Sequence, residues 1–267
     1  MLPHRTLLEG ARHPEAFAAV LNLADTALRT WEPRWSAFLS GSEAEEIEAG
    51  LAQLSELSLR WDGGLPGAER RCLRLARREQ DRNGSDLAED GVDQAPLDGL
   101  EISGNFLFDP ASAADLRTAL VQLGADAAAI GDLWLRGDRG GQAIVCRNLA
   151  ERLDGASGEL RTVPLLISRR PIVELQPPAA RLPRALNSVE ASLRLDAVAS
   201  AGFGLPRSRV KALISDGAAR INWQPVQQPS TPVAVGDRIR IEGRGELLIT
   251  DIQATKRDRW RLSMERR

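Results

Sequence analysis

The chain has 267 residues, 43% of them hydrophobic and 27% charged, and its formal net charge is −2. This length allows two or three domains with real cores, and the composition is ordinary for a globular protein. The polar stretch MLPHRTLLEGARHPE is not typical of a signal peptide, and no apolar run approaches the ~20 residues of a membrane span. We therefore expect a cytoplasmic protein without stable membrane insertion.

Residues 1–80 predict a helical region. Apolar residues follow helical spacing from Phe17 to Leu39, and SEAEEIEAGLAQLSEL begins with a capping-box pattern at Ser42 and Glu45. Pro66 suits the start of a further helix, GAERRCLRLARRE. That helix would carry five arginines able to contact phosphates, although such a run is more often a solvated face: Arg70, Arg71, Arg74, Arg77 and Arg78.

The middle of the chain predicts one small α+β domain between two linkers. Residues 81–98 are acidic and poor in apolar side chains, which indicates a linker. Residues 99–170 contain a strand (LEISGNFLF), a helix ending at Gly124, a hairpin (DLWLRG with GQAIVC), a helix (RNLAERL) and a strand (LRTVPLLI). This βαββαβ order is that of ferredoxin-like and RNA-recognition (RRM-like) folds. The third strand offers no stacking aromatic residue, so topology alone does not make this domain an RNA reader. Residues 171–189 hold four prolines and predict a second linker.

The C-terminal domain, residues 190–267, differs from the rest in charge. It carries 14 Lys and Arg against 9 Asp and Glu, whereas residues 1–189 carry 21 against 28. A basic segment in an acidic chain suggests a polyanionic partner, or else only the preference for arginine seen throughout this chain.

The pattern of this domain predicts two helices followed by strands. The first helix, ASLRLDAVASAGFG, ends near Gly202, and Pro206 starts the second, with Val210, Leu213 and Ile214 inward. Gly217 suits a left-handed helix end. The strands AARIN and DRIRI follow, with Arg238 and Arg240 outward, and ATKRDRW forms the turn of a last hairpin. We expect Trp223 to pack in the core or against a strand.

The C-terminal stretch resembles the S-four RNA-binding domain, named after a ribosomal small-subunit protein. The resemblance rests on RLDAV, SRVKALI, DG, ARIN and VGDRIRI, over about fifty residues. Pro206 stands where the family usually has Ser or Thr, and Asn222-Trp223-Gln224 replaces the usual Asn-Gly-Lys turn. The resemblance implies a small α+β domain that grips structured RNA.

Further stretches resemble the cyanobacterial photosystem II S-four domain proteins, which are similar to the YlmH family of bacterial RNA-binding proteins. These are RTWEPRWSAFLS, LPGAERRCLRLARRE, LEISGNFLFDP and AGFGLPRSR. The resemblance implies an α+β protein with an N-terminal helical region, an RRM-like centre and an S-four domain. It also implies a role at ribosomes, on stalled large subunits carrying peptidyl-tRNA. Relatives often have a His-Arg helix start where this chain has SAADLRTAL, which leaves Arg117 as the cation there.

Enzymatic patterns are weak in this sequence. Asp196 superficially matches the catalytic Asp of pseudouridine synthases, but an ion pair or a helix terminus explains it better. The glycines of RGDRGGQ fit a hairpin rather than a cofactor loop, and no synthetase core is present. His4 and His13 lack companion metal ligands and indicate a frayed terminus, and Cys72 and Cys146 indicate core positions. We expect no catalysis, no cofactor and no metal.

The leading hypothesis is an RNA-binding protein whose partner is rRNA or tRNA, including the large ribosomal subunit, rather than DNA. The alternatives are an assembly factor for photosystem II that docks on a protein or membrane partner and, more weakly, an RNA-modifying enzyme. The expected RNA contacts are Arg194, Arg207, Ser208, Arg209, Lys211, Arg220, Asn222, Lys256 and Arg257.

Overall fold

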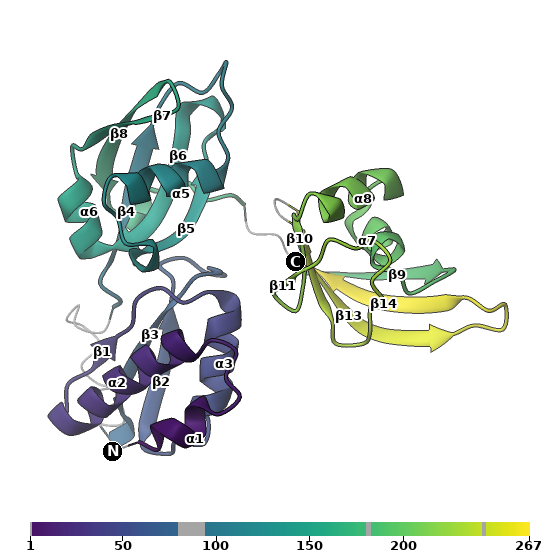
Figure 1. The fold of residues 1–267 in the computed structure, drawn as a ribbon, viewed down its shortest axis with the longest axis horizontal. Coiled ribbons are helices and arrows are strands. Elements are labelled where there is room, and N and C mark those ends of the chain that lie inside the picture. Colours follow the sequence, from purple (N-terminus) through teal and green to yellow (C-terminus); the bar gives the residue numbers. More distant parts are fainter. Residues whose placement is uncertain (1, 80–93, 180–182, 242–243) are drawn as a thin grey trace. The chain divides into compact units, whose positions relative to one another are not determined.

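A computed structural model describes residues 2–79, 94–179, 183–241 and 244–267 (Figure 1). The chain divides into two compact units, Met1–Pro178 and Ala179–Arg267. The first unit has an N-terminal part and a central part, each with its own sheet. The second unit contains one sheet of its own.

The N-terminal part packs three helices against a three-stranded antiparallel sheet. The helices are α1 (His4–Leu8), α2 (Pro14–Thr30) and α3 (Gly41–Leu51). The sheet has the order β1-β3-β2, from β1 (Arg34–Trp35), β2 (Leu57–Asp62) and β3 (Cys72–Arg77). Its core joins α2 and α3 to the strands through Phe17, Leu21, Ile47, Leu57, Leu73 and Leu75.

Part of the helical prediction for residues 1–80 is wrong. Helix α2 ends at Thr30 because Trp31 adopts a left-handed conformation (φ 60°), and the chain then extends into β1. The predicted helix GAERRCLRLARRE contains strand β3, whose residues are buried on both faces, as is common in a central strand. The capping box of α3 is formed by Ser40 and Glu43, two residues before the predicted pair.

The five arginines of the mispredicted helix are engaged within the protein. Arg70 donates to the carbonyls of Ile130 and Phe38, and Arg78 donates to that of Leu57. The guanidinium groups of Arg71 and Arg77 lie over Trp61 and Trp31, 5.1 and 4.1 Å from the ring centroids. Arg74 is buried. These contacts explain the arginines structurally, without a phosphate partner.

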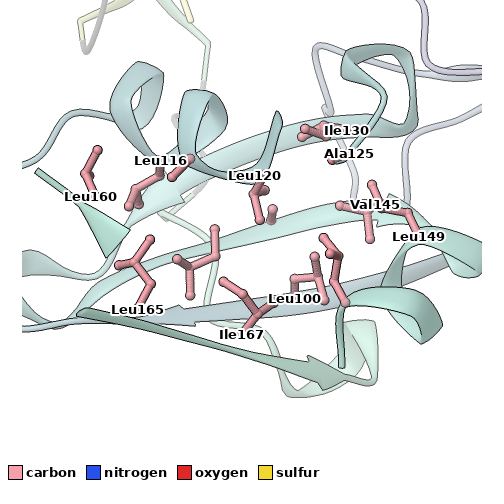
Figure 2. Close-up of a cluster of buried hydrophobic side chains, with 14 of the residues drawn as sticks. Leu100, Leu116, Leu120, Ala125, Ile130, Val145, Leu149, Leu160, Leu165 and Ile167 are labelled. Atoms are coloured by element: carbon pink, nitrogen blue, oxygen red, sulfur yellow. The ribbon is translucent and has the colours of Figure 1, made fainter. Parts of the chain in front are cut away.

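The central part is a five-stranded antiparallel sheet with the strand order β5-β6-β4-β8-β7. Its strands are β4 (Leu97–Ser103), β5 (Ile130–Leu135), β6 (Gly140–Cys146), β7 (Ser157–Leu160) and β8 (Val163–Arg170). Helices α5 (Ala113–Gln122) and α6 (Arg147–Leu153) cover one face, and the buried cluster between them and the sheet is drawn in Figure 2. The elements follow the order βαββαβ, with β7 added.

Several local predictions for this part agree with the structure. Helix α5 ends just before Gly124, which has φ +87°, and β5 and β6 form the predicted hairpin. Two predictions are wrong. The first strand ends at Ser103, before NFLF, and the single last strand is a hairpin of β7 and β8, which turns at Arg161 with φ 56°.

The second face of the central sheet is covered by the N-terminal part and by residues 172–176. We call this contact the interface cluster, and it consists of Phe38, Cys72, Ala95, Leu97, Trp134, Ile144 and Leu175. Trp134 Nε1 donates to the carbonyl of Gln176 at 2.9 Å, and Gln176 N donates to Gln142 Oε1 at 2.8 Å. The backbone N–H groups of Glu69 and Arg70 donate to Asp132, at 2.8 and 3.0 Å. Helices therefore cover one face of this sheet and chain segments cover much of the other.

Both predicted linkers are too long. Most of the first, residues 81–98, lies outside the described residues, but Ala95 and Leu97 are buried and Leu97 begins β4. In the second, residues 171–189, a short helix η3 (Ile172–Glu174) and buried Leu175 belong to the first unit. Strand β9 (Arg184–Glu190) pairs with β14 in the second unit, so that unit begins before residue 190. The boundary itself, between Pro178 and Ala179, lies inside the predicted linker.

The second unit packs two helices on one face of a six-stranded sheet with the order β11-β10-β12-β13-β14-β9. The helices are α7 (Leu195–Phe203) and α8 (Arg207–Ser215). The strands are β10 (Ala219–Ile221), β11 (Gln224–Pro225), β12 (Arg238–Ile241), β13 (Gly245–Ala254) and β14 (Trp260–Arg266). The shared core includes Val198, Phe203, Val210, Ile214, Ile239, Leu247 and Leu262.

The predicted second helix, the left-handed Gly217 (φ +79°), the strands and the last hairpin are present. The first helix starts at Leu195 rather than Ala191, because Arg194 has extended backbone angles.

Candidate nucleic-acid interface

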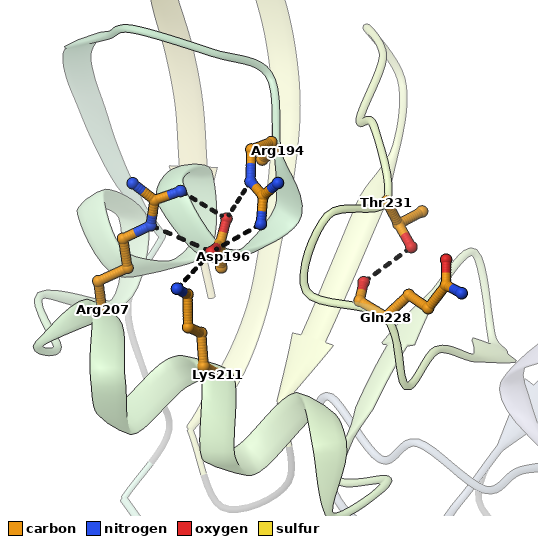
Figure 3. A network of polar contacts seen from close by, with 6 residues as sticks. All are labelled: Arg194, Asp196, Arg207, Lys211, Gln228 and Thr231. Atoms are coloured by element: carbon orange, nitrogen blue, oxygen red, sulfur yellow. Dashed lines mark hydrogen bonds and ion pairs between the residues drawn. The ribbon is translucent and has the colours of Figure 1, made fainter.

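Asp196 lies at the centre of a cluster of three cations at the start of the two helices (Figure 3). Arg194 donates to it from Nε at 3.1 Å and from Nη2 at 3.3 Å. Arg207 donates from Nε at 3.1 Å and from Nη2 at 3.0 Å, and Lys211 Nζ lies 3.7 Å away. We call these four residues the Asp196 cluster. The ion-pair interpretation of Asp196 is therefore confirmed.

The cluster presents positive charge outward from a buried anion. Asp196 is fully buried, whereas the side chains of Arg194, Arg207 and Lys211 are 41%, 49% and 51% exposed. Burial alone would raise the pKa of Asp196, but the hydrogen bonds from Arg194 and Arg207 outweigh it and lower that pKa to about 2. The carboxylate therefore stays ionised, and three cations against one anion leave the exposed surface positive.

The backbone N–H groups at the start of α7 are hydrogen-bonded within the same domain. The backbone N–H of Leu195 donates to the carbonyl of Thr231 at 2.8 Å, and that of Asp196 donates to the carbonyl of Pro229 at 3.0 Å. Thr231 Oγ1 donates to the carbonyl of Gln228, which closes this loop beside the cluster (Figure 3). The loop fixes the position of Asp196, and the anion-binding potential of this surface rests on side chains rather than on the N-terminus of α7.

Helix α8 supplies further exposed polar groups. Arg209 and Ser208 are exposed, and among the described residues their side chains make no hydrogen bond or ion pair. Ser208 does not cap the helix, since α8 starts after Pro206 without a side-chain cap. Residues 207–211 therefore bring three cations and one hydroxyl to one exposed turn.

Arg220 lies on the opposite face of the sheet from the helices. Its neighbours Ala219 and Ile221 pack toward the helices, so alternation turns Arg220 outward, opposite Arg240 of β12. The structure therefore does not bring Arg220 to the Asp196 cluster.

Trp223 packs against a strand rather than in the core, which is the second of its two predicted roles. Asn222 and Trp223 both have positive φ (48° and 70°), and they form the tight turn between β10 and β11. The half-buried indole lies beneath Arg238 and Arg240, whose guanidinium carbons are 5.1 and 5.7 Å from its centroid. The sequence indicated that both arginines point outward, but it gave no sign that they share one aromatic ring.

Asn222 uses its side chain inside this turn. Its Nδ2 donates to Asp237 Oδ1 at 2.7 Å, and its Oδ1 accepts from the backbone N–H of Arg238 at 3.0 Å. These bonds connect the turn to the start of β12. A structural role thus accounts for Asn222 without RNA.

Lys256 and Arg257 are exposed at the tip of the β13–β14 hairpin, beyond the last strand pair Ala254–Trp260. Ala254 lies six positions along β13 from Leu248, the residue opposite Arg238, and six steps along a strand span about 20 Å. The tip is therefore separate from the cations of β10 and β12.

The remaining candidates have structural explanations. His4 Nε2 and Asp25 Oδ2 are 2.7 Å apart, and the N–H of Leu2 donates to Asp25 Oδ1, so the described N-terminus is held rather than frayed. His13 precedes α2. Within the described residues there is no group of three potential metal ligands and no helix long and apolar enough to cross a membrane.

Two segments match known families. Residues 193–239, which hold the Asp196 cluster, both helices and the Trp223 turn, match the S4 domain, the S-four domain of the sequence analysis. Residues 12–80 match the N-terminal region of YlmH. The chain is thus YlmH-like and contains an S4 domain.

Two individual proteins are similar to parts of the chain. The ribosome-associated protein quality control protein P2 of Bacillus subtilis (strain 168) is 41% identical over 76 residues, which are 28% of this chain and 30% of that protein. This chain therefore spans less than a third of that relative's length. The solved structure of the cell division protein ylmH from Streptococcus pneumoniae has a TM-score of 0.47 and 15% identity, covering 61% of this chain and 94% of that one.

Proposed function

We propose that this chain is a non-enzymatic RNA-binding protein that acts on the ribosome in the cytoplasm. The Asp196 cluster, with its three half-exposed cations held on one buried carboxylate, carries this proposal. Cations fixed in place lose little side-chain entropy when they meet a phosphate, and phosphate contacts position a protein on its nucleic acid. The S4 domain and the ribosome-associated relative support the same function.

The proposed interface is the exposed side of the two helices. Arg194, Arg207, Arg209 and Lys211 would contact phosphates, and Ser208 would donate to a phosphate or a ribose. This combination fits double-helical rRNA or tRNA, which proteins recognise mostly through backbone and shape. Arg220 on the outer sheet face, Asn222 in its turn, and Lys256 with Arg257 at the hairpin tip remain predicted secondary contacts.

The central part would serve as a scaffold rather than as a second RNA reader. Its sheet has the strand order of RRM-like folds, but the face on which such domains stack bases holds the interface cluster here. Among the described residues, no observation favours the photosystem alternative or the enzyme alternative.

Crosslinking in the native cells, followed by sequencing of the attached RNA, tests the proposal. The wild-type chain should give reads concentrated on one large-subunit rRNA or tRNA site. A double variant, Arg207→Glu with Lys211→Glu, should lose them. Because this variant also removes two cationic partners of the buried Asp196, it is compared at a temperature where its melting curve shows that it is folded. Background-level RNA from the wild-type chain would refute RNA binding, and reads unchanged in the double variant would refute the proposed interface.

A further inference from the structure

The two cysteines of the chain, Cys72 and Cys146, meet inside the first unit. Cys72 is the first residue of β3 in the N-terminal part, and Cys146 is the last residue of β6 in the central part. Cys72 belongs to the interface cluster and Cys146 packs against it, and the two thiols lie close enough to shift each other's pKa. Two residues that are distant in the sequence thus place their sulfur atoms side by side.

The two thiols have unequal surroundings. Cys72 is 1% exposed, whereas Cys146 is half-buried and can be reached from solvent. The interaction with the Cys146 thiol, together with burial, raises the pKa of Cys72, and the same interaction lowers the pKa of Cys146. Cys146 is therefore the group that an oxidant meets first, and Cys72 is the sheltered neighbour.

We propose that Cys72 and Cys146 are a site of covalent modification, at which an oxidant converts the thiol pair into a disulfide that ties β3 to β6. Both cysteines are free thiols in the structure. The bond would cross-link the N-terminal and central parts at the cluster that covers the second face of the central sheet.

A peroxide supplies the chemistry. The Cys146 thiolate attacks one oxygen of hydrogen peroxide, the O–O bond breaks, and a sulfenic acid and one water form. The Cys72 sulfur then attacks the sulfenic sulfur, loses its proton, and releases the oxygen as a second water. In total, two thiols lose two electrons to one peroxide, and one S–S bond forms. A dithiol reductant reverses the step by thiol–disulfide exchange.

Peptide mapping of the full chain provides the direct test. Dilute protein is treated with hydrogen peroxide, blocked with an alkylating agent and digested with trypsin without reduction. Cleavage after Arg71, Arg74, Arg139 and Arg147 releases the peptides CLR and GGQAIVCR, which should appear linked and separate on reduction. The treated chain should still run as a monomer on a non-reducing gel. It should also lose both titratable thiols.

Two single-residue variants separate the role of Cys146 from that of Cys72 in the oxidation. Cys72→Ser should leave a sulfenic acid on GGQAIVCR that dimedone traps, whereas Cys146→Ser should leave CLR largely unmodified. Because replacing the buried Cys72 can disturb folding, the half-buried Cys146→Ser is the decisive control, and its melting temperature under reducing conditions should match the wild type. Oxidation should raise the melting temperature of the wild-type chain alone, by about 5 °C or more.

Three results would overturn the proposal. The first is sulfinic acid on GGQAIVCR without the linked peptide, the second is disulfides only between chains, and the third is an equal melting shift in the Cys146→Ser variant. None of these results bears on RNA binding, which the crosslinking experiment tests separately.

Discussion

Asp196 and Arg207 are joined by two hydrogen bonds, from Nε to Oδ2 at 3.1 Å and from Nη2 to Oδ1 at 3.0 Å. Asp196 lies in the first turn of α7, and Arg207 is the first residue of α8. The pair therefore connects the starts of two helices, and it holds the guanidinium group in one orientation at the exposed surface. This contact contributes both to the stability of the domain and to the proposed RNA binding. Substitutions at either residue should therefore affect both properties.

Asp196→Asn should lower the free energy of unfolding at neutral pH by about 1–2 kcal/mol. This value is smaller than the pKa shift alone would imply, because solvent screens the half-exposed cationic partners of Asp196. The folded-state pKa of Asp196, about 2, lies below its ordinary value of 3.8, so its contribution is present above that ordinary value. The contribution is lost as the pH falls toward 2. Urea unfolding of both proteins between pH 7 and pH 2 should show their difference shrinking. A difference that stays constant to pH 2 would mean that the charge of Asp196 contributes nothing.

Arg207→Glu with Lys211→Glu should weaken binding to a structured rRNA fragment at least tenfold at moderate salt. If about four phosphates are contacted, log K should fall with log salt with a slope of roughly −3 to −4, and losing two contacts should flatten it by roughly 1.5–2. The matched control is Lys256→Glu with Arg257→Glu, the same charge change at the hairpin tip, where the effect should be smaller. An equal loss in both variants would extend the interface to the tip, and a salt-independent affinity would argue against phosphate contacts.

Gly140→Ala should destabilise the first unit by about 3 kcal/mol or more. Gly140 has φ +108°, and a Cβ there would lie 1.9 Å from the carbonyl oxygen of Ile102. Gly137 serves as the control, because it also has positive φ (+66°) but no atom within 4 Å of an added Cβ. Gly137→Ala should cost about 1 kcal/mol, from backbone strain alone. Comparable melting temperatures for the two variants would contradict the close approach of β6 to β4.

Trp134→Ala should destabilise the protein by about 3 kcal/mol and leave the RNA affinity of the folded chain unchanged. Trp134 is 8% exposed, packs in the interface cluster, and donates to the carbonyl of Gln176. Denaturant unfolding and RNA titration of the same preparation separate the two effects. A folded variant with weakened RNA binding would assign the central sheet a direct role in recognition.

The sequence determined the local features that depend on a few neighbouring residues. The end of α5 near Gly124, the left-handed Gly217 and the hairpin between β5 and β6 each follow from helix-end or turn chemistry. The same holds for the second helix of the C-terminal domain, where Val210 and Ile214 set the buried stripe and leave Arg207 and Lys211 outward. The cations of the proposed interface could therefore be named before their positions were known.

Only the tertiary structure decided features that depend on distant partners. Strand β3 lies in a stretch whose sequence predicts a helix starting near Pro66, but pairing with β1 and β2 buries both its faces and makes it a strand. Trp223 and Arg240 become neighbours because β10 pairs with β12, and Cys72 meets Cys146 because the N-terminal part packs on the central sheet. Propensity and spacing act within a few residues, whereas these contacts form between segments that only the folded packing brings together.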